Sequence, residues 1–159
     1  MSFLGISGML YSGASLAQSR IVVAEDSNVF TSMISKRLDE LFGIKVDICR
    51  NFTDLQDAYE TSSQPVALAI SNINLPGAEN GEALDYLLDL SIPTIVFTSS
   101  FQQKVRDQIL AKDIVDYIIK DNVFAVEMLA EAVCRFLTNE RQRLLIVDDS
   151  PTARALLST

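Results

Sequence analysis

Residues 20–27 read Arg20-Ile-Val-Val-Ala-Glu-Asp-Ser27, a short apolar run followed at once by two carboxylates. The run from Ile21 to Ala24 is apolar and rich in β-branched side chains, as expected for a strand buried on both faces. The next segment repeats apolar residues at helical spacing up to Phe42, and Gly43 then supplies a helix stop. These apolar helix positions are Val29, Phe30, Met33, Ile34, Leu38, Leu41 and Phe42. The stretch predicts a strand, an acidic junction and a helix.

The same alternation of short apolar runs and longer amphipathic stretches continues to about residue 138. Further strands are predicted at 45–49, 67–70, 94–98 and 115–119, and further helices at 52–61, 81–90, 101–111 and 124–137. Five strands alternating with five helices predict an α/β fold, a doubly wound parallel sheet of five strands with helices on both faces. In such sheets functional residues gather at the carboxyl ends of the strands, so we expect the site there.

Composition excludes several classes of function. The hydrophobic fraction of 48% and charged fraction of 21% are those of a globular protein, and the net charge of −8 disfavours direct contact with nucleic acid. The chain has no histidine, which excludes Ser-His-Asp catalysis and histidine-ligated metals. Cys49 and Cys134 lie far apart and in no metal-binding spacing, as expected for reduced thiols in a cytoplasmic protein.

The chain also contains an internal repeat. Arg20-Ile-Val-Val-Ala-Glu-Asp-Ser27 recurs as Arg143-Leu-Leu-Ile-Val-Asp-Asp-Ser150, with a second acidic pair at Asp148 and Asp149. We therefore expect one domain at 20–138, a linker at 139–143 and the start of a second, similar domain at 144–159, as in a longer tandem protein. Residues 1–19 are apolar but broken by glycines, which predicts a flexible or loosely helical leader rather than a membrane span; a docking helix is the alternative.

Polar residues follow four of the predicted strands. Glu25 and Asp26 follow the first strand, where adjacent carboxylates can offer hard oxygen ligands to Mg²⁺. The other runs are Asn72-Ile-Asn-Leu-Pro-Gly77, Val96-Phe-Thr98 and Asp116-Tyr-Ile-Ile-Lys120. In this order and spacing the motifs resemble those of response-regulator receiver domains (CheY-like), and the repeat suggests the first of a tandem pair, as in receiver–receiver–GGDEF regulators.

The resemblance implies a role for each matching residue. Receiver domains form an acyl phosphate on an aspartate in the loop after the third strand, beside a divalent ion. By resemblance, Glu25, Asp26 and the backbone carbonyl of Asn74 would bind Mg²⁺. Thr98 and Lys120 would contact the phosphate, and Tyr117 would be the aromatic switch residue.

Two residues depart from the family pattern. Asn72 stands at the phosphoacceptor position, and a carboxamide is an uncharged, poor nucleophile. We therefore expect no phosphorylation there and weakened Mg²⁺ binding, with no organic cofactor; Ser71 is expected to point to the other face of the strand. Asn72 is either the natural residue of a degenerate receiver or an engineered replacement of aspartate. Asp121 follows Lys120 where the family usually has proline, which predicts a trans peptide bond.

The resemblance implies a signalling module of a two-component phosphorelay rather than an enzyme. Its expected partners are the adjacent receiver and output domains, such as a GGDEF-type diguanylate cyclase, reached through the fourth helix, fifth strand and fifth helix. A sensor histidine kinase and a homodimer remain open as further partners. A dehalogenase-type phosphatase is disfavoured because it needs a DxD motif after the first strand, where Glu25 and Asp26 are adjacent. A flavodoxin-like carrier is disfavoured because the acidic pair would repel the phosphate of its flavin. A nucleotide hydrolase is disfavoured because no GxxxxGK[ST] motif occurs.

Overall fold

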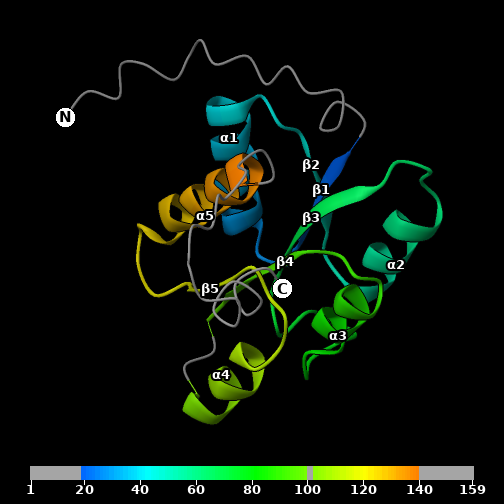
Figure 1. Ribbon diagram of the computed structural model, residues 1–159, viewed down its shortest axis with the longest axis vertical. Helices are drawn as coiled ribbons and strands as arrows, with labels where there is room; N and C mark the ends of the chain where they lie inside the picture. The colour runs from blue at the N-terminus through cyan, green and yellow to red at the C-terminus, as the bar shows by residue number, and fades with distance from the viewer. Residues whose placement is uncertain (1–18, 100–101, 140–159) are drawn as a thin grey trace, which may run out of the picture.

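The structure, a computed structural model, describes residues 19–99 and 102–139 (Figure 1). Strands and helices alternate throughout this part of the chain, as predicted. The strands are β1 Arg20–Ala24, β2 Val46–Cys49, β3 Val66–Ser71, β4 Thr94–Thr98 and β5 Asp116–Ile119. The helices are α1 Asn28–Phe42, α2 Phe52–Glu60, α3 Glu82–Asp89, α4 Gln103–Leu110 and α5 Ala125–Asn139.

The strands form one parallel sheet with the order β2-β1-β3-β4-β5. Parallel neighbours cannot be joined by tight hairpins, which is why a helix separates each strand from the next. The strand order reverses beside β1, which lies between β2 and β3. The carboxyl ends of β1 and β3 therefore form the topological switch point, where α/β sheets bind their ligands. This architecture confirms the predicted fold class.

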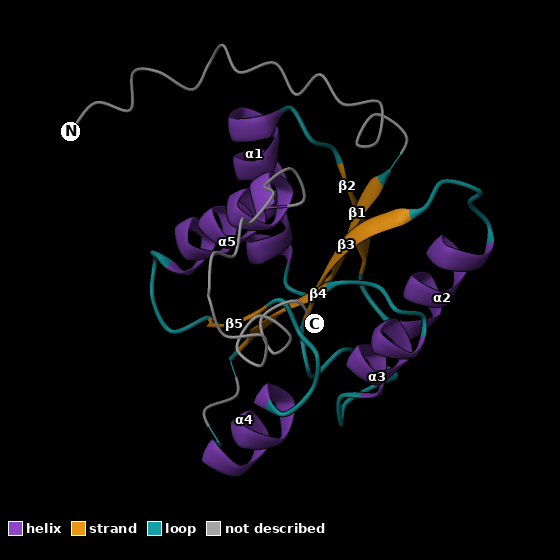
Figure 2. Cartoon of the chain, viewed as in Figure 1, coloured by secondary structure: helices purple, strands orange, loops and turns teal. Residues whose placement is uncertain are grey.

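Helices cover both faces of the sheet (Figure 2). Alternate strand residues face opposite layers, so that Val23 packs on the side of α1 and α5 while Val22 packs against α2 and α3. A third cluster, which contains Leu84 of α3 and Ile109 of α4, extends the second layer. The sheet thus contributes side chains to an apolar core on each of its faces, as the uninterrupted apolar character of the strands indicated.

Both ends of α1 are capped, and the Gly43 cap is the helix stop that the sequence predicted. Ser27 accepts a hydrogen bond from the Phe30 backbone N–H, and Gly43 ends the helix with a φ of 65°. The prediction of one apolar stripe along α1 is only partly confirmed, because the side chains of Val29, Met33 and Leu41 are exposed, at 66%, 41% and 43%. A helix that packs along one side cannot bury so wide a stripe.

The two cysteines are unpaired thiols. Burial, reinforced by the nearby carboxylates of Asp54 and Asp47, raises the pKa of the Cys49 thiol to about 11. Cys49 is therefore protonated and unreactive at neutral pH.

The leader at 1–18 and the expected second repeat, including Asp148 and Asp149, lie outside the described residues. Among the helices in the described part of the chain, none has the length and apolar character that a membrane span requires.

Candidate functional site

The predicted polar residues meet at the carboxyl edge of the sheet because backbone hydrogen bonds align the strand ends. The Asn72 N–H donates to the Ala24 carbonyl at 2.9 Å, which joins the end of β3 to the end of β1. The Lys120 N–H donates to the Thr98 carbonyl at 2.9 Å, which does the same for β5 and β4. This alignment brings Glu25, which directly follows β1, within reach of the Lys120 side chain.

Glu25 and Lys120 form a buried ion pair. The Lys120 ammonium donates to Glu25 Oε2 at 2.6 Å, and the two side chains are only 5% and 2% exposed respectively. The other carboxylate oxygen of Glu25 accepts the Ser27 backbone N–H at 2.9 Å. The ammonium also lies 5.1 Å from the ring centre of Phe30 and 5.5 Å from that of Phe97. Lys120 is therefore held on Glu25 in this structure.

Asn72 is buried and its carboxamide contacts both neighbouring segments. Its Nδ2 donates to the Asn74 carbonyl at 3.3 Å and to Asp26 Oδ1 at 3.5 Å, while its Oδ1 accepts the Asn74 N–H at 3.4 Å. All three distances are at the long end for hydrogen bonds, so each contact is weak. The orientation is nevertheless chemically required, because a reversed amide would place its oxygen against two other oxygens. Ser71, fully buried, donates its hydroxyl to the Asn72 carbonyl.

Thr98 and Tyr117 lie on neighbouring strands. Thr98 is the last residue of β4 and is fully buried. Tyr117 is partly buried against the cluster that contains Ile73 and Ile109, with the Arg106 guanidinium 6.0 Å from its ring centre. Burial raises the pKa of the Tyr117 hydroxyl, and the charge of Arg106 partly offsets the rise. The ring is thus packed between β5 and α4, next to the loop that carries Asn72.

The side chains do not fit a divalent ion as they stand. Of the expected ligands, Glu25 is occupied by Lys120 and Ser27, and Asp26 and the Asn74 carbonyl accept hydrogen bonds from the Asn72 amide. Within residues 19–99 and 102–139, no group of three or more His, Cys, Asp or Glu residues is arranged to hold a metal. The Lys120–Asp121 bond is trans, as expected, since no cis peptide occurs in the described chain.

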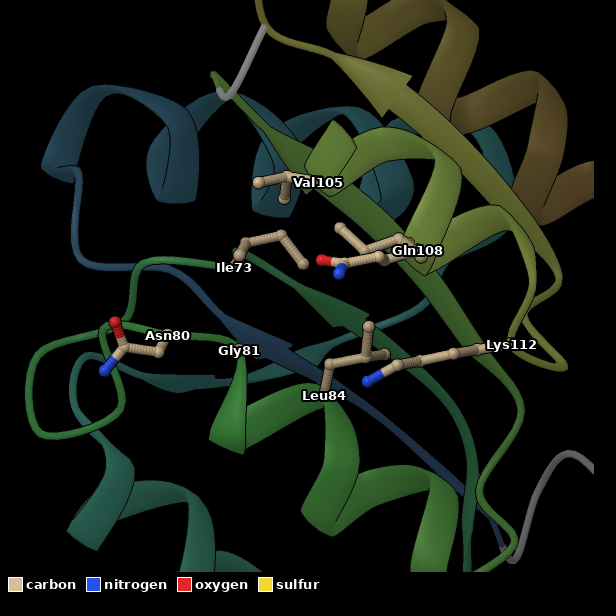
Figure 3. Close-up of a pocket in the computed structure, with 8 residues that line it drawn as sticks. Ile73, Asn80, Gly81, Leu84, Val105, Gln108 and Lys112 are labelled. Atoms are coloured by element: carbon tan, nitrogen blue, oxygen red, sulfur yellow. The ribbon is translucent and has the colours of Figure 1, made fainter. Parts of the chain in front are cut away.

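Two surface hollows flank the site and were not predicted. One, of about 310 Å³, lies between α3 and α4 and is lined by residues that include Ile73, Leu84 and Val105 (Figure 3). The other, of about 350 Å³, lies between α1 and the loop after β5, and Phe30 and Lys120 form part of its wall. Leu84, Val105 and Phe30 are apolar residues of helices, a pattern typical of core positions, so the sequence does not predict that part of this surface stays open.

Comparison with known proteins agrees with the fold just described. No family model and no curated protein matches the chain. The chain has the CheY-like fold, and the similar solved structures are response-regulator receiver domains or proteins that contain one. One similar solved structure, a "probable two-component system response regulator/GGDEF domain protein", is 26% identical over 88% of this chain, with a TM-score of 0.74. A receiver domain protein (CheY-like) from Methanospirillum hungatei JF-1 is 21% identical, with a TM-score of 0.63, over 77% of this chain and 96% of its own.

Relative length distinguishes the two kinds of similar structure. The chain spans 56% of the length of the first response regulator/GGDEF protein. A second protein of this kind is also 26% identical, with a TM-score of 0.73; the match covers 87% of this chain and 55% of that protein. These two response regulator/GGDEF proteins are therefore longer than one receiver domain, whereas the Methanospirillum hungatei structure corresponds to a single receiver domain.

Proposed function

We propose that this chain is a regulatory receiver module that does not form an acyl phosphate and that acts through contacts with neighbouring domains. The observation that carries the proposal is the amide of Asn72, which stands at the end of β3 and contacts Asp26 and the Asn74 carbonyl. A carboxylate in this position would offer an anionic oxygen to a phosphodonor. A carboxamide is uncharged, and its oxygen is a much poorer nucleophile than a carboxylate oxygen, so nucleophilic attack is not expected.

The proposal includes no catalytic turnover by this chain. The buried carboxylate of Glu25 and the ammonium of Lys120 neutralise each other, which leaves neither as a free acid, base or nucleophile at the site. We infer that the candidate site supports the conformation of the strand ends and the loops that follow them. A signal would then pass through the surface of the domain rather than through a chemical step.

The proposed partners are adjacent receiver and output domains of a longer chain. The similar response regulator/GGDEF proteins are multidomain, which supports this arrangement and makes a diguanylate cyclase the proposed output. The proposed contact surface is the α4–β5–α5 face together with the loop before α5. Large apolar side chains are exposed there, notably Leu110 (50%), Val123 (78%) and Phe124 (67%). A sensor histidine kinase and a second copy of the chain are further proposed partners.

The proposal is tested by intact-mass measurement after incubation with acetyl phosphate and Mg²⁺. The protein should not gain a phosphoryl group, whereas Asn72→Asp should gain one because it supplies the missing carboxylate. Asn74→Asp is the matched control: it makes the same chemical change two residues away on the same loop, at an exposed side chain, and should remain unmodified.

A phosphoryl gain by the unaltered protein would contradict the proposal. A gain by Asn72→Asp alone would support it, and would also favour an engineered or recent replacement of aspartate at this position. If Asn72→Asp stays unmodified as well, the rest of the pocket has also diverged, and the module is better regarded as a scaffold for its neighbours.

A further inference from the structure

The oxygens that a divalent ion would require at this edge already have a donor in the structure. Asn72 Nδ2 lies between the Asn74 carbonyl, at 3.3 Å, and Asp26 Oδ1, at 3.5 Å. These two oxygens belong to two of the three Mg²⁺ ligands that the receiver resemblance assigns. A carboxamide N–H₂ has two protons and a partial positive charge, so one amide nitrogen can satisfy both oxygens.

The remaining carboxylate has a donor of its own. Glu25 accepts from the Lys120 ammonium and the Ser27 N–H, and both side chains of the ion pair are almost fully buried. The ammonium group of Lys120 thus balances the charge of Glu25, and the amide dipole of Asn72 partly offsets the charge of Asp26. Nothing at this edge then depends on a cation from solution.

We propose that the Asn72 carboxamide takes the place of a divalent cation, so that this receiver edge is held together without Mg²⁺. The inference rests on the proposed function, since both concern the same position, but it is a different claim. A site that merely lacks one ligand would bind Mg²⁺ weakly. A site in which an amide occupies the ion's contacts excludes Mg²⁺ until that amide is removed.

Substitution of Asn72 distinguishes these two cases. With Asn72→Asp, a third carboxylate faces Asp26 and the Asn74 carbonyl, and these oxygens repel one another unless a cation lies between them. With Asn72→Ala, the amide is gone but no carboxylate is added. If the amide blocks the ion, Asn72→Ala should bind Mg²⁺ better than the unaltered protein; if a missing ligand is the sole cause, it should bind no better.

The experiment measures thermal unfolding with EDTA and with increasing MgCl₂ at constant ionic strength, and direct binding of Mn²⁺ by electron paramagnetic resonance. The unaltered protein should show the same Tm throughout and no bound Mn²⁺. Asn72→Asp should lose Tm in EDTA and regain about 3–6 °C as Mg²⁺ saturates its site. Asn72→Ala should show a smaller, saturable gain together with detectable Mn²⁺ binding.

Asn80→Ala is the matched control, because it removes an exposed carboxamide from a residue outside the proposed ligands. It should behave like the unaltered protein. Saturable binding of Mn²⁺ by the unaltered protein would overturn the inference, as would equal, undetectable binding by the unaltered protein and Asn72→Ala. Neither result would bear on the mass measurement, so failure of this inference is distinguishable from failure of the proposed function.

Discussion

The ion pair between Glu25 and Lys120 is the contact of the candidate site in which charge and burial are most closely coupled. Both side chains are nearly inaccessible to water, at 2% and 5% exposure. A buried pair of this kind contributes little net stability compared with apolar residues, because both charges have lost their hydration. Removal of one partner is a different matter, since it leaves the other charge buried without compensation.

We therefore expect Lys120→Met to lower the free energy of unfolding by about 3 kcal/mol. The substitution keeps the length of the side chain but leaves the Glu25 carboxylate with only the Ser27 N–H. Adding Glu25→Gln should recover most of the loss, because the buried charge is then gone as well. Guanidinium denaturation of both variants measures the effect. If the free energy of unfolding of Lys120→Met stays within about 0.5 kcal/mol of that of the original protein, the prediction is wrong and water reaches Glu25.

The sequence predicted which residues would meet at this edge but not how they would pair. Glu25, Asp26, Asn72 and Lys120 all follow strands of a predicted parallel sheet, so their proximity follows from topology alone. The partner of each side chain depends on register and rotamer. The resemblance assigns Lys120 a contact with phosphate, which stays a prediction, and nothing in the sequence indicated that its ammonium would pair with Glu25 near the rings of Phe30 and Phe97.

At the scale of elements, local signals determined most boundaries. The end of α1 agrees with the prediction because Gly43 acts through its own backbone conformation, independently of the rest of the fold. Ser27 caps the other end through its side chain, a local signal that the prediction did not use. The exposure of Val29 and Met33 could not be predicted in the same way. It depends on how far α5 extends over α1, which is a property of the packed pair of helices.

Gly43 provides a test of the helix-ending signal. Its φ of 65° is unfavourable for residues with a Cβ, and a Cβ added there would meet no atom within 4 Å. Any cost of Gly43→Ala is thus backbone strain rather than a clash, and we expect a loss of about 1 kcal/mol in the free energy of unfolding. Gly43→Asn should lose less, since asparagine tolerates this conformation better. Equal stability of the alanine variant and the original would mean that the helix ends differently.

For the whole molecule, the sheet couples two cores that do not touch each other directly. Ile34 of α1 belongs to the core shared with α5, and Ile92, which precedes β4, belongs to the core under α2 and α3. The apolar side chains of each helix layer are buried only against the sheet, and each face of the sheet is shielded from water only by its own helices. The described domain should therefore unfold in one cooperative step, and the carboxyl edge should be lost together with both cores.

Two mild truncations on opposite faces test this coupling. Ile34→Val and Ile92→Val each remove one buried methylene and should each cost about 1 kcal/mol. Because the sheet separates the two sites, the double variant should lose the sum, about 2 kcal/mol, within about 0.5 kcal/mol. Denaturation followed by far-ultraviolet circular dichroism and by tyrosine fluorescence should give coincident transitions in all three proteins. If the two probes separate in either single variant, one layer can melt while the sheet persists, and the carboxyl edge would then respond to events on one face alone.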